Sequence, residues 1–341
     1  MSSEAKFHVV LTDYEWPDLS IEHGAFSPLG INFTAARCKR EDEVLRVAEN
    51  ADAIITEYAP LSQKVIHSLR RCKIISMNAA GFDNVNLEAA TDEGILLVNC
   101  PDYCFEEVAD HTMAMILSCA RGLFQYDRRI RNGIWDYKSA GPRERVRDSV
   151  LGLIGFGRVA QAVAARARSF GMRVVASDPF MPDEFFKAQG VQPATSQEIL
   201  AAADYLSIHV PLTKDTHKSI GAEELSRMKR SAFVINASRG PVVDEKALYE
   251  ALKSGIVRGA ALDVLEQEPP DFDNPLLSLD NVLVTPHAAF YSEDAVSEVR
   301  SRSAQEVIKV FKGELPGHIV NGKVLENGKL RMTTKNTNDT K

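Results

Sequence analysis

The chain has 341 residues, which predicts about two domains. Apolar residues make up 45% and charged residues 26%, as in soluble globular proteins, and this excludes a disordered or fibrous chain over most of the length. The net charge of −7 lacks the excess of Lys and Arg that direct binding to nucleic acid or to an anionic membrane needs.

The five cysteines are an odd number, without metal-ligand spacing. They predict free thiols in a reducing, cytoplasmic compartment, and no metal site. The N-terminus lacks the pattern of a signal peptide, and no apolar stretch approaches the length of a membrane span.

Short apolar runs alternate with amphipathic stretches along the first third of the chain, which predicts parallel strands joined by helices. A long helix is expected next, over 106–131, and Asn132-Gly133 ends it. The expected strands are Phe7–Thr12, Ala53–Thr56, Lys73–Met77 and Ile95–Asn99, and the helices between them are Glu41–Glu49 and Ser62–Arg70.

A second alternating series follows a charged loop and ends in a long helix over Glu293–Phe311. Thr195 and Glu198 have the spacing of a capping box. The expected strands are Val150–Ile154, Arg173–Ser177, Tyr205–Val210, Phe233–Ala237, Gly259–Val264 and Val282–Thr285. The expected helices are Val159–Phe170, Gln197–Ala202, Ala222–Met228 and Asp244–Lys253.

These two series predict two α/β domains. The larger one is placed at 104–290, and the smaller one combines 1–103 with 291–325. The polar stretch 326–341 is expected to be a flexible tail. A cleft between two such domains is a common place for a small-molecule site.

The segment Gly155-Phe156-Gly157-Arg158-Val159-Ala160 follows an apolar strand and opens a helix. Such a turn brings the backbone close to a pyrophosphate at the N-terminus of the helix. Asp178 ends the next strand, about 20 residues further on, where a carboxylate can bind ribose hydroxyls. The pattern predicts dinucleotide binding. It favours NAD over NADP, because a 2′-phosphate would meet the charge of Asp178.

Three polar residues follow later strands of the same series: Arg239, Glu268 and His287. Taken singly, each is consistent with an ordinary loop residue. Together they suit hydride transfer to a 2-oxo acid, because a histidine can supply the proton, a carboxylate can orient the imidazole, and an arginine can bind the substrate carboxylate.

Several segments together resemble the D-isomer-specific 2-hydroxyacid dehydrogenases over about residues 50–312. The matching segments are Gly81–Val85, Leu151–Val159, Asn236–Gly240 with Val243–Glu245, Ala260–Val264, Glu268-Pro269 and Thr285–His287.

The resemblance implies two Rossmann-like domains. The larger is a doubly wound, NAD-binding domain, and the smaller is a flavodoxin-like substrate domain. It further implies a small 2-oxo or 2-hydroxy acid as substrate, and a homodimer formed through helix 106–131. Arg239, Glu268 and His287 would be catalytic, and Ala79, Ala80 and Gly81 would bind the substrate together with Arg239. The implied cofactor-binding residues are Gly155, Phe156, Gly157, Arg158, Val159, Asp178, His209, Val210, Pro211, Thr216, Ala237, Ser238, Arg239, Asp263, His287 and Ala289.

Two alternatives stay open within the same superfamily. The stretch His287–Glu293 resembles the C-terminal-binding-protein corepressors, which bind NAD(H) and act through protein partners. D-3-phosphoglycerate dehydrogenase is the other, although Met77 stands where such enzymes often carry an arginine. In the substrate loop, Ala79 replaces the usual first glycine.

Overall fold

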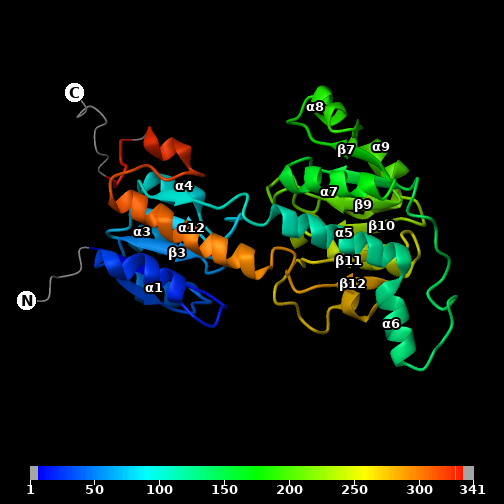
Figure 1. The fold of residues 1–341 in the computed structure, drawn as a ribbon, viewed down its shortest axis with the longest axis horizontal. Helices are drawn as coiled ribbons and strands as arrows, with labels where there is room; N and C mark the ends of the chain where they lie inside the picture. Colours follow the sequence, from blue (N-terminus) through cyan, green and yellow to red (C-terminus); the bar gives the residue numbers. More distant parts are fainter. Residues whose placement is uncertain (1–6, 327, 333–341) are drawn as a thin grey trace, which may run out of the picture. The chain divides into compact units, whose positions relative to one another are not determined.

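The computed structural model describes residues 7–326 and 328–332. The chain folds into two compact units, one formed by residues up to Tyr103 together with those from Ser292 onward, and the other by Cys104–Tyr291. Each unit has its own parallel sheet with helices on both faces, which confirms the predicted α/β class (Figure 1).

The first unit contains a five-stranded sheet in the order β2-β1-β3-β4-β5. All pairs are parallel, and the order reverses between β1 and β3, as in flavodoxin-like folds. The strands are β1 (His8–Leu11), β2 (Asn32–Ala35), β3 (Ala53–Thr56), β4 (Ile74–Met77) and β5 (Leu96–Val98).

Side-chain alternation along these strands fills two core layers. Val10, Ile54 and Ile75 pack under α2 (Glu41–Ala48), α3 (Gln63–Ser68) and α4 (Leu87–Asp92). Val9, Ile55 and Ile74 pack under α1 (Ser20–Phe26) and α12 (Glu293–Phe311). Burying each of these side chains contributes about 1.5–3 kcal/mol, so both faces of the sheet are tied to their helices.

The second unit contains a seven-stranded parallel sheet in the order β12-β11-β10-β9-β6-β7-β8. The chain starts at β6 within the sheet, adds β7 and β8 on one side, and then adds β9 to β12 on the other side. This is the doubly wound order of dinucleotide-binding domains. The strands are β6 (Val150–Ile154), β7 (Arg173–Ser177), β8 (Gln192–Pro193), β9 (Tyr205–Ile208), β10 (Phe233–Asn236), β11 (Gly259–Leu262) and β12 (Val282–Val284).

Helices α5 (Phe105–Arg121), α7 (Arg158–Ser169) and α8 (Asp183–Ala188) cover one face of this sheet. Helices α9 (Ser196–Ala202), α10 (Ala222–Ser226) and α11 (Glu245–Lys253) cover the other. The predicted capping box of Thr195 and Glu198 is present at the start of α9. Short 3-10 turns lie at Ser27–Leu29, Gly240–Val242, Pro275–Ser278 and Gly322–Leu325.

The prediction of one helix over 106–131 is wrong. Helix α5 ends at Arg121, and α6 (Leu123–Arg131) begins after Gly122. Gly122 has a φ of +64°, and its N–H bonds to the carbonyls of Cys119 and Ser118. This left-handed residue ends α5 and redirects the chain.

Part of the expected flexible tail is docked on the first unit. The N–H of Arg331 bonds to the carbonyl of Gly94 at 3.0 Å, and its guanidinium pairs with Glu93 at 2.5 Å. Met332 is only 6% exposed. These contacts of Arg331 and Met332 are with the first unit, and residues 327 and 333–341 lie outside the described part of the chain.

Among the described residues, no helix combines the length and the apolar character that crossing a membrane would need.

Candidate active site

The turn after β6 has two glycines with different structural requirements. Gly155 has a φ of +88°, and a Cβ there would lie 2.5 Å from the carbonyl oxygen of His209, so the fold itself requires glycine. At Gly157 a Cβ would meet no described atom within 4 Å. Packing does not explain the second glycine, whereas a phosphate held against the N-terminus of α7 does.

Asp178, at the end of β7, faces this turn. One carboxylate oxygen accepts the N–H of Phe156 at 2.9 Å, and the other accepts the N–H of Phe180 at 3.0 Å. Each oxygen keeps further acceptor capacity, so the carboxylate can also bind ribose hydroxyls. The residues of the turn therefore fit the NAD that the sequence predicts.

The segment after β9 borders the same turn. The Nε2 atom of His209 is hydrogen-bonded to the Ser207 hydroxyl at 2.8 Å, and burial lowers the pKa of His209 to about 4. A neutral imidazole there adds no charge beside the turn. Thr216 donates to the carbonyl of Pro211 at 2.6 Å and thereby fixes the segment that also contains Val210.

His287 and Glu268 form a direct pair at the carboxyl end of this sheet. The Nδ1 atom of His287 lies 2.6 Å from Oε2 of Glu268, while Oε1 accepts the N–H of Leu265 at 2.9 Å. Burial acts to raise the pKa of Glu268, but the bond to His287 and the charge of Arg239 help to bring it below its ordinary value. The carboxylate is therefore ionised at neutral pH.

Asp263 holds the loop that carries His287. Its carboxylate accepts the N–H groups of Ala288 and Ala289, both at 2.9 Å, and the hydroxyl of Thr285 at 2.6 Å. The backbone of His287 has a φ of +52°, an uncommon conformation for a residue with a side chain, and its N–H bonds to the Asp263 carbonyl at 2.7 Å. These bonds stabilise the conformation that presents the imidazole.

Arg239 follows β10 and reaches the same region of the unit. Its Nη1 atom donates to the Ser238 carbonyl at 2.8 Å, and its own carbonyl accepts the side chain of the buried Asn236 at 2.9 Å. A Cβ on Gly240 would lie 1.9 Å from the Leu265 carbonyl oxygen, so the glycine allows the β10 and β11 loops to meet. Arg239 is close enough to affect the ionisation of Glu268. The structure thus gathers all three residues around one sheet edge.

The segment Ala79–Gly81 belongs to the other unit and follows β4. Its carbonyls are occupied, because that of Ala79 accepts the N–H of Cys100 at 3.0 Å and that of Ala80 accepts the Asn99 amide at 2.6 Å. Within the described chain, the backbone N–H groups of Ala79, Ala80 and Gly81 have no acceptor. Consecutive free N–H groups of this kind suit a carboxylate.

Comparison with known proteins decides the family. Residues 113–289 match the D-isomer specific 2-hydroxyacid dehydrogenase, NAD binding domain. A glyoxylate reductase of Korarchaeum cryptofilum is 38% identical over 287 residues, which cover 83% of this chain and 86% of that protein. The chain belongs to the D-isomer-specific 2-hydroxyacid dehydrogenase family.

Other members of the family show the same likeness. A D-3-phosphoglycerate dehydrogenase of Methanocaldococcus jannaschii is 40% identical over 283 residues, or 82% of this chain, and the chain spans only 54% of that relative. The structure of a D-lactate dehydrogenase from Aquifex aeolicus, complexed with NAD and lactic acid, superposes with a TM-score of 0.84 at 30% identity. The superposition covers 92% of this chain and 99% of that one.

These findings confirm three predictions: the family, its NAD-dependent oxidoreductase class and the NAD-binding Rossmann domain. A further residue of this unit contacts the loop that carries His287. His111 of α5 is hydrogen-bonded to Thr285 at 3.0 Å and lies 3.5 Å from Asp263. The resemblance implied a nicotinamide contact for Asp263, whereas its described bonds hold the His287 loop.

Within the described ranges, no group of three or more His, Cys, Asp or Glu side chains could hold a metal ion.

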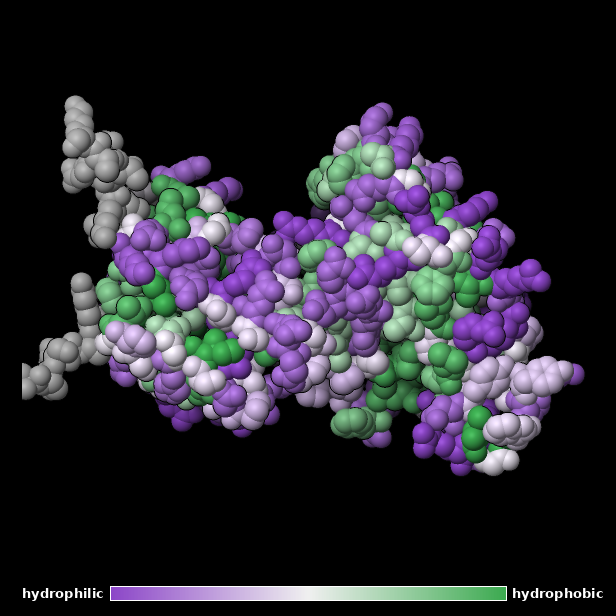
Figure 2. All heavy atoms as spheres, viewed as in Figure 1, coloured by the Kyte–Doolittle hydropathy of each residue, from purple (hydrophilic) through white to green (hydrophobic). Residues whose placement is uncertain are grey.

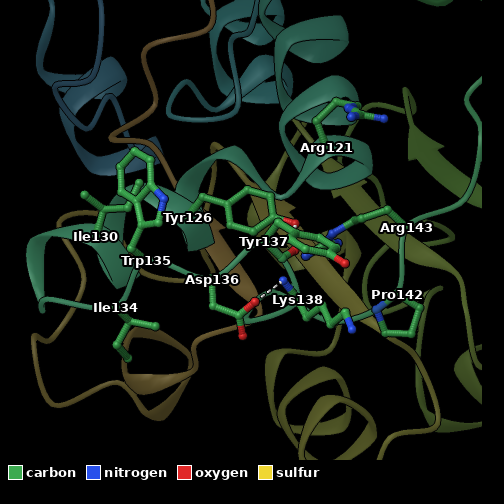
Figure 3. A pocket seen from close by; sticks show the side chains of 11 residues that line it. Arg121, Tyr126, Ile130, Ile134, Trp135, Asp136, Tyr137, Lys138, Pro142 and Arg143 are labelled. Atoms are coloured by element: carbon green, nitrogen blue, oxygen red, sulfur yellow. Dashed lines mark hydrogen bonds between the residues drawn. The ribbon is translucent and has the colours of Figure 1, made fainter.

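A second surface of this 2-hydroxyacid dehydrogenase lies on α6 and the segment after it. Side chains of neutral and apolar character gather there (Figure 2). A hollow of about 1080 Å³ is lined by Tyr126, Ile130, Trp135 and Tyr137, with Arg121 and Arg143 among its other residues (Figure 3). Trp135 is 90% and Tyr137 79% exposed. An apolar surface of this kind is typical of a protein-binding face.

Proposed function

We propose that the protein interconverts a small 2-oxo acid and the corresponding D-2-hydroxy acid, with NAD(H) supplying or receiving the hydride at C2. The observation that carries the proposal is the 2.6 Å contact of His287 with an ionised Glu268, beside Arg239 and on the same sheet as the Gly155–Ala160 turn. A proton donor, its orienting carboxylate and a cation are the groups that this reaction needs.

His287 is the acid and base of the proposed reaction. Its Nδ1–H donates to Glu268, which leaves Nε2 as the ring atom that transfers a proton. In reduction, Nε2–H donates its proton to the carbonyl oxygen at C2 as that oxygen gains negative charge. In oxidation, neutral Nε2 accepts the hydroxyl proton. Glu268 stabilises the imidazolium in both directions.

Arg239 and, in the other unit, the segment Ala79–Gly81 each offer donor groups that can bind a substrate. The guanidinium offers paired N–H donors for the carboxylate and polarises the carbonyl at C2. The N–H groups of Ala79, Ala80 and Gly81, which have no acceptor among the described residues, are suited to bind a substrate carboxylate. Met77 is fully buried in the core of its unit, so its position offers no cation to a phosphorylated substrate.

The test is reduction of glyoxylate, hydroxypyruvate, pyruvate and phenylpyruvate, followed by NADH absorbance. The proposal expects turnover of at least one of these, and a loss of about 10²–10⁴-fold in His287→Ala, the usual contribution of a positioned acid–base group. A parallel series with NADPH tests the preference that Asp178 imposes. The proposal fails if no 2-oxo acid oxidises NADH above the His287→Ala control.

We also propose that the chain forms a homodimer through α6 and the segment that follows it. Helix α5 is the less suitable contact, because its apolar residues Ala109, Met113, Ile116 and Cys119 are buried in the core of their own unit. The exposed side chains on and after α6 include Ile130, Ile134, Trp135 and Tyr137, which makes this part of the predicted helical region the better interface.

A further inference from the structure

Four polar residues follow four neighbouring strands of the first unit. Asp13 comes after β1, Glu57 after β3, Asn78 after β4 and Asn99 after β5. The strands are parallel, so these residues lie at one edge of the sheet, where ligands of open α/β sheets bind. The segment Ala79–Gly81 begins at the same edge.

Asn78 is the unusual member of this row. Its side chain is buried, with the whole residue 1% exposed, yet neither its Oδ1 nor its Nδ2 has a hydrogen-bond partner within the described chain. Asn99, by comparison, donates to the Ala80 carbonyl. Buried amides are nearly always paired, because leaving both groups without partners costs their full desolvation. The unpaired amide of Asn78 therefore indicates a hydrogen-bond partner that is not part of the protein.

The direction of Asn78 follows from the strand. Its N–H bonds to the Thr56 carbonyl at 2.8 Å, so the regular pairing of β4 with β3 continues through this residue. Asn78 thus lies on the same face as Ser76, whose hydroxyl bonds to the Ser303 carbonyl in α12. Trp16 packs on this face too, and its buried Nε1 likewise has no partner among the described residues. Unpaired donor and acceptor groups are therefore present on this face, beyond the ends of β1 and β4.

The charges at this edge restrict the chemistry of the partner. The carboxylate of Asp13 accepts bonds from Thr12, Thr56 and the N–H groups of Glu57 and Tyr58, at 2.6–3.1 Å. Burial and the charge of Asp13 raise the pKa of Glu57 to about 8, so that this neighbour is uncharged at neutral pH. A second anionic group on the substrate would meet the charge of Asp13, whereas an uncharged polar group would not.

We propose that Asn78 is a specificity-determining residue that hydrogen-bonds an uncharged polar substituent, such as a hydroxyl, on C3 of the 2-oxo acid. The proposal rests on the function proposed above. The segment after Asn78 binds the carboxylate at C1, and only C2 separates that carboxylate from C3. A residue directly before the segment is therefore placed to contact the C3 substituent.

Three substrates that differ only beyond C2 test the proposal. Glyoxylate has no C3, pyruvate has a methyl group there, and hydroxypyruvate has a hydroxyl group. The wild-type enzyme is expected to reduce hydroxypyruvate with a kcat/KM about tenfold above that for pyruvate, the discrimination expected from one or two hydrogen bonds. It is also expected to disfavour 3-phosphohydroxypyruvate about tenfold or more relative to hydroxypyruvate.

The variant Asn78→Leu keeps the size of the side chain and removes both amide groups. In this variant the kcat/KM for hydroxypyruvate divided by that for pyruvate is expected to fall about tenfold. The kcat/KM for glyoxylate is expected to change less than about twofold. Asn78→Ser, which retains a hydroxyl group, is expected to restore part of the ratio. The matched control is Asn321→Leu, because Asn321 is a buried asparagine of the same unit whose amide bonds to Leu97 and Ile95.

The thermal unfolding temperature separates a substrate role from a structural one. Asn78→Leu replaces an unpaired amide and should unfold at or above the wild-type temperature, whereas Asn321→Leu should unfold below it with its substrate ratio unchanged. An unchanged ratio in Asn78→Leu would mean that only a buried water pairs with the amide, and would overturn the inference. Preference of the wild type for the phosphorylated substrate would overturn it independently of any variant. Failure to reduce even glyoxylate would instead refute the function on which the inference rests.

Discussion

The Nδ1 atom of His287 lies 2.6 Å from Oε2 of Glu268, and the second oxygen of that carboxylate is held by the backbone N–H of Leu265. The carboxylate is therefore fixed from one side by the backbone, and it fixes the imidazole on the other. In the proposed reaction this arrangement directs Nε2 of His287 to the proton transfer, and the reaction then depends on the charge of Glu268.

The first prediction concerns that charge. Glu268→Gln keeps an oxygen that can accept the bond from His287 but removes the negative charge that stabilises the imidazolium. We expect kcat/KM for reduction to fall about 10²-fold at pH 7.5. Steady-state rates with NADH at that pH measure the effect.

The matched control for this prediction is Glu266→Gln. Glu266 pairs with Lys218 at 3.1 Å and stands two residues before Glu268 in the sequence. Its kcat/KM should match that of the wild type. An unchanged kcat/KM in Glu268→Gln, with NADH binding intact, would contradict the proposed role of the carboxylate.

The second prediction separates the two glycines of the nucleotide turn. Gly155→Ala places a Cβ 2.5 Å from the His209 carbonyl oxygen at a φ of +88°, so we expect a loss of stability of about 1–3 kcal/mol. The Cβ of Gly157→Val meets no described atom within 4 Å and the residue has an ordinary φ of −71°, so the fold should tolerate the substitution while NADH binding weakens at least tenfold. Thermal unfolding and quenching of NADH fluorescence give the two readouts. Equal NADH affinity in Gly157→Val would show that the cofactor does not approach this turn.

The third prediction is a pH dependence of stability from Glu57. Its folded pKa is raised from the ordinary value of 4.5 to about 8, first by burial and then by the charge of Asp13. Between these two values the folded protein keeps a proton that the unfolded chain has lost. The contribution of Glu57 to stability is therefore complete below pH 4.5 and disappears as the pH rises through 8.

Glu57→Gln tests this dependence because it keeps the uncharged form at every pH. The variant should unfold close to the wild-type temperature at pH 5 and several degrees above it at pH 9, since about 1 kcal/mol corresponds to roughly 2–4 °C for a unit of this size. Glu88→Gln, an exposed acid of α4, serves as the control and should show no such trend. A constant difference between Glu57→Gln and wild type across the pH range would contradict the shifted ionisation.

The sequence predicted most accurately the elements whose residue pattern agrees with their burial and capping in the folded chain. Strand β6 and helix α12 have the expected bounds, because one is a fully apolar run and the other begins after Ser292, whose side chain caps it. Strand β2 was missed because it is a partly exposed edge strand without an apolar run. The break at Gly122 was missed because a glycine within an amphipathic pattern can either remain in a helix or adopt the left-handed conformation that ends it.

The candidate site shows the same division. Arg239 and His287 could be proposed from the sequence because they follow apolar runs that end at a sheet edge. The hydrogen bonds from the N–H groups of Ala288 and Ala289 to Asp263 could not be proposed from the sequence, because they depend on the backbone conformation of the His287 loop. The unpaired amide of Asn78 is likewise a property of packing, since no sequence pattern says whether a buried asparagine finds a partner.

The last prediction concerns assembly. Trp135→Glu places a charge within the apolar face on α6 and the segment after it, where burial of an unpaired charge against a second copy would be strongly unfavourable. We expect the mass measured by light scattering to fall from that of a dimer to that of a monomer at micromolar protein concentration. Phe272→Glu is the matched control, because Phe272 is an 84% exposed aromatic residue outside this face and its variant should keep the wild-type mass. A dimer that survives Trp135→Glu, or a wild-type chain that is monomeric, would show that this face does not join two copies.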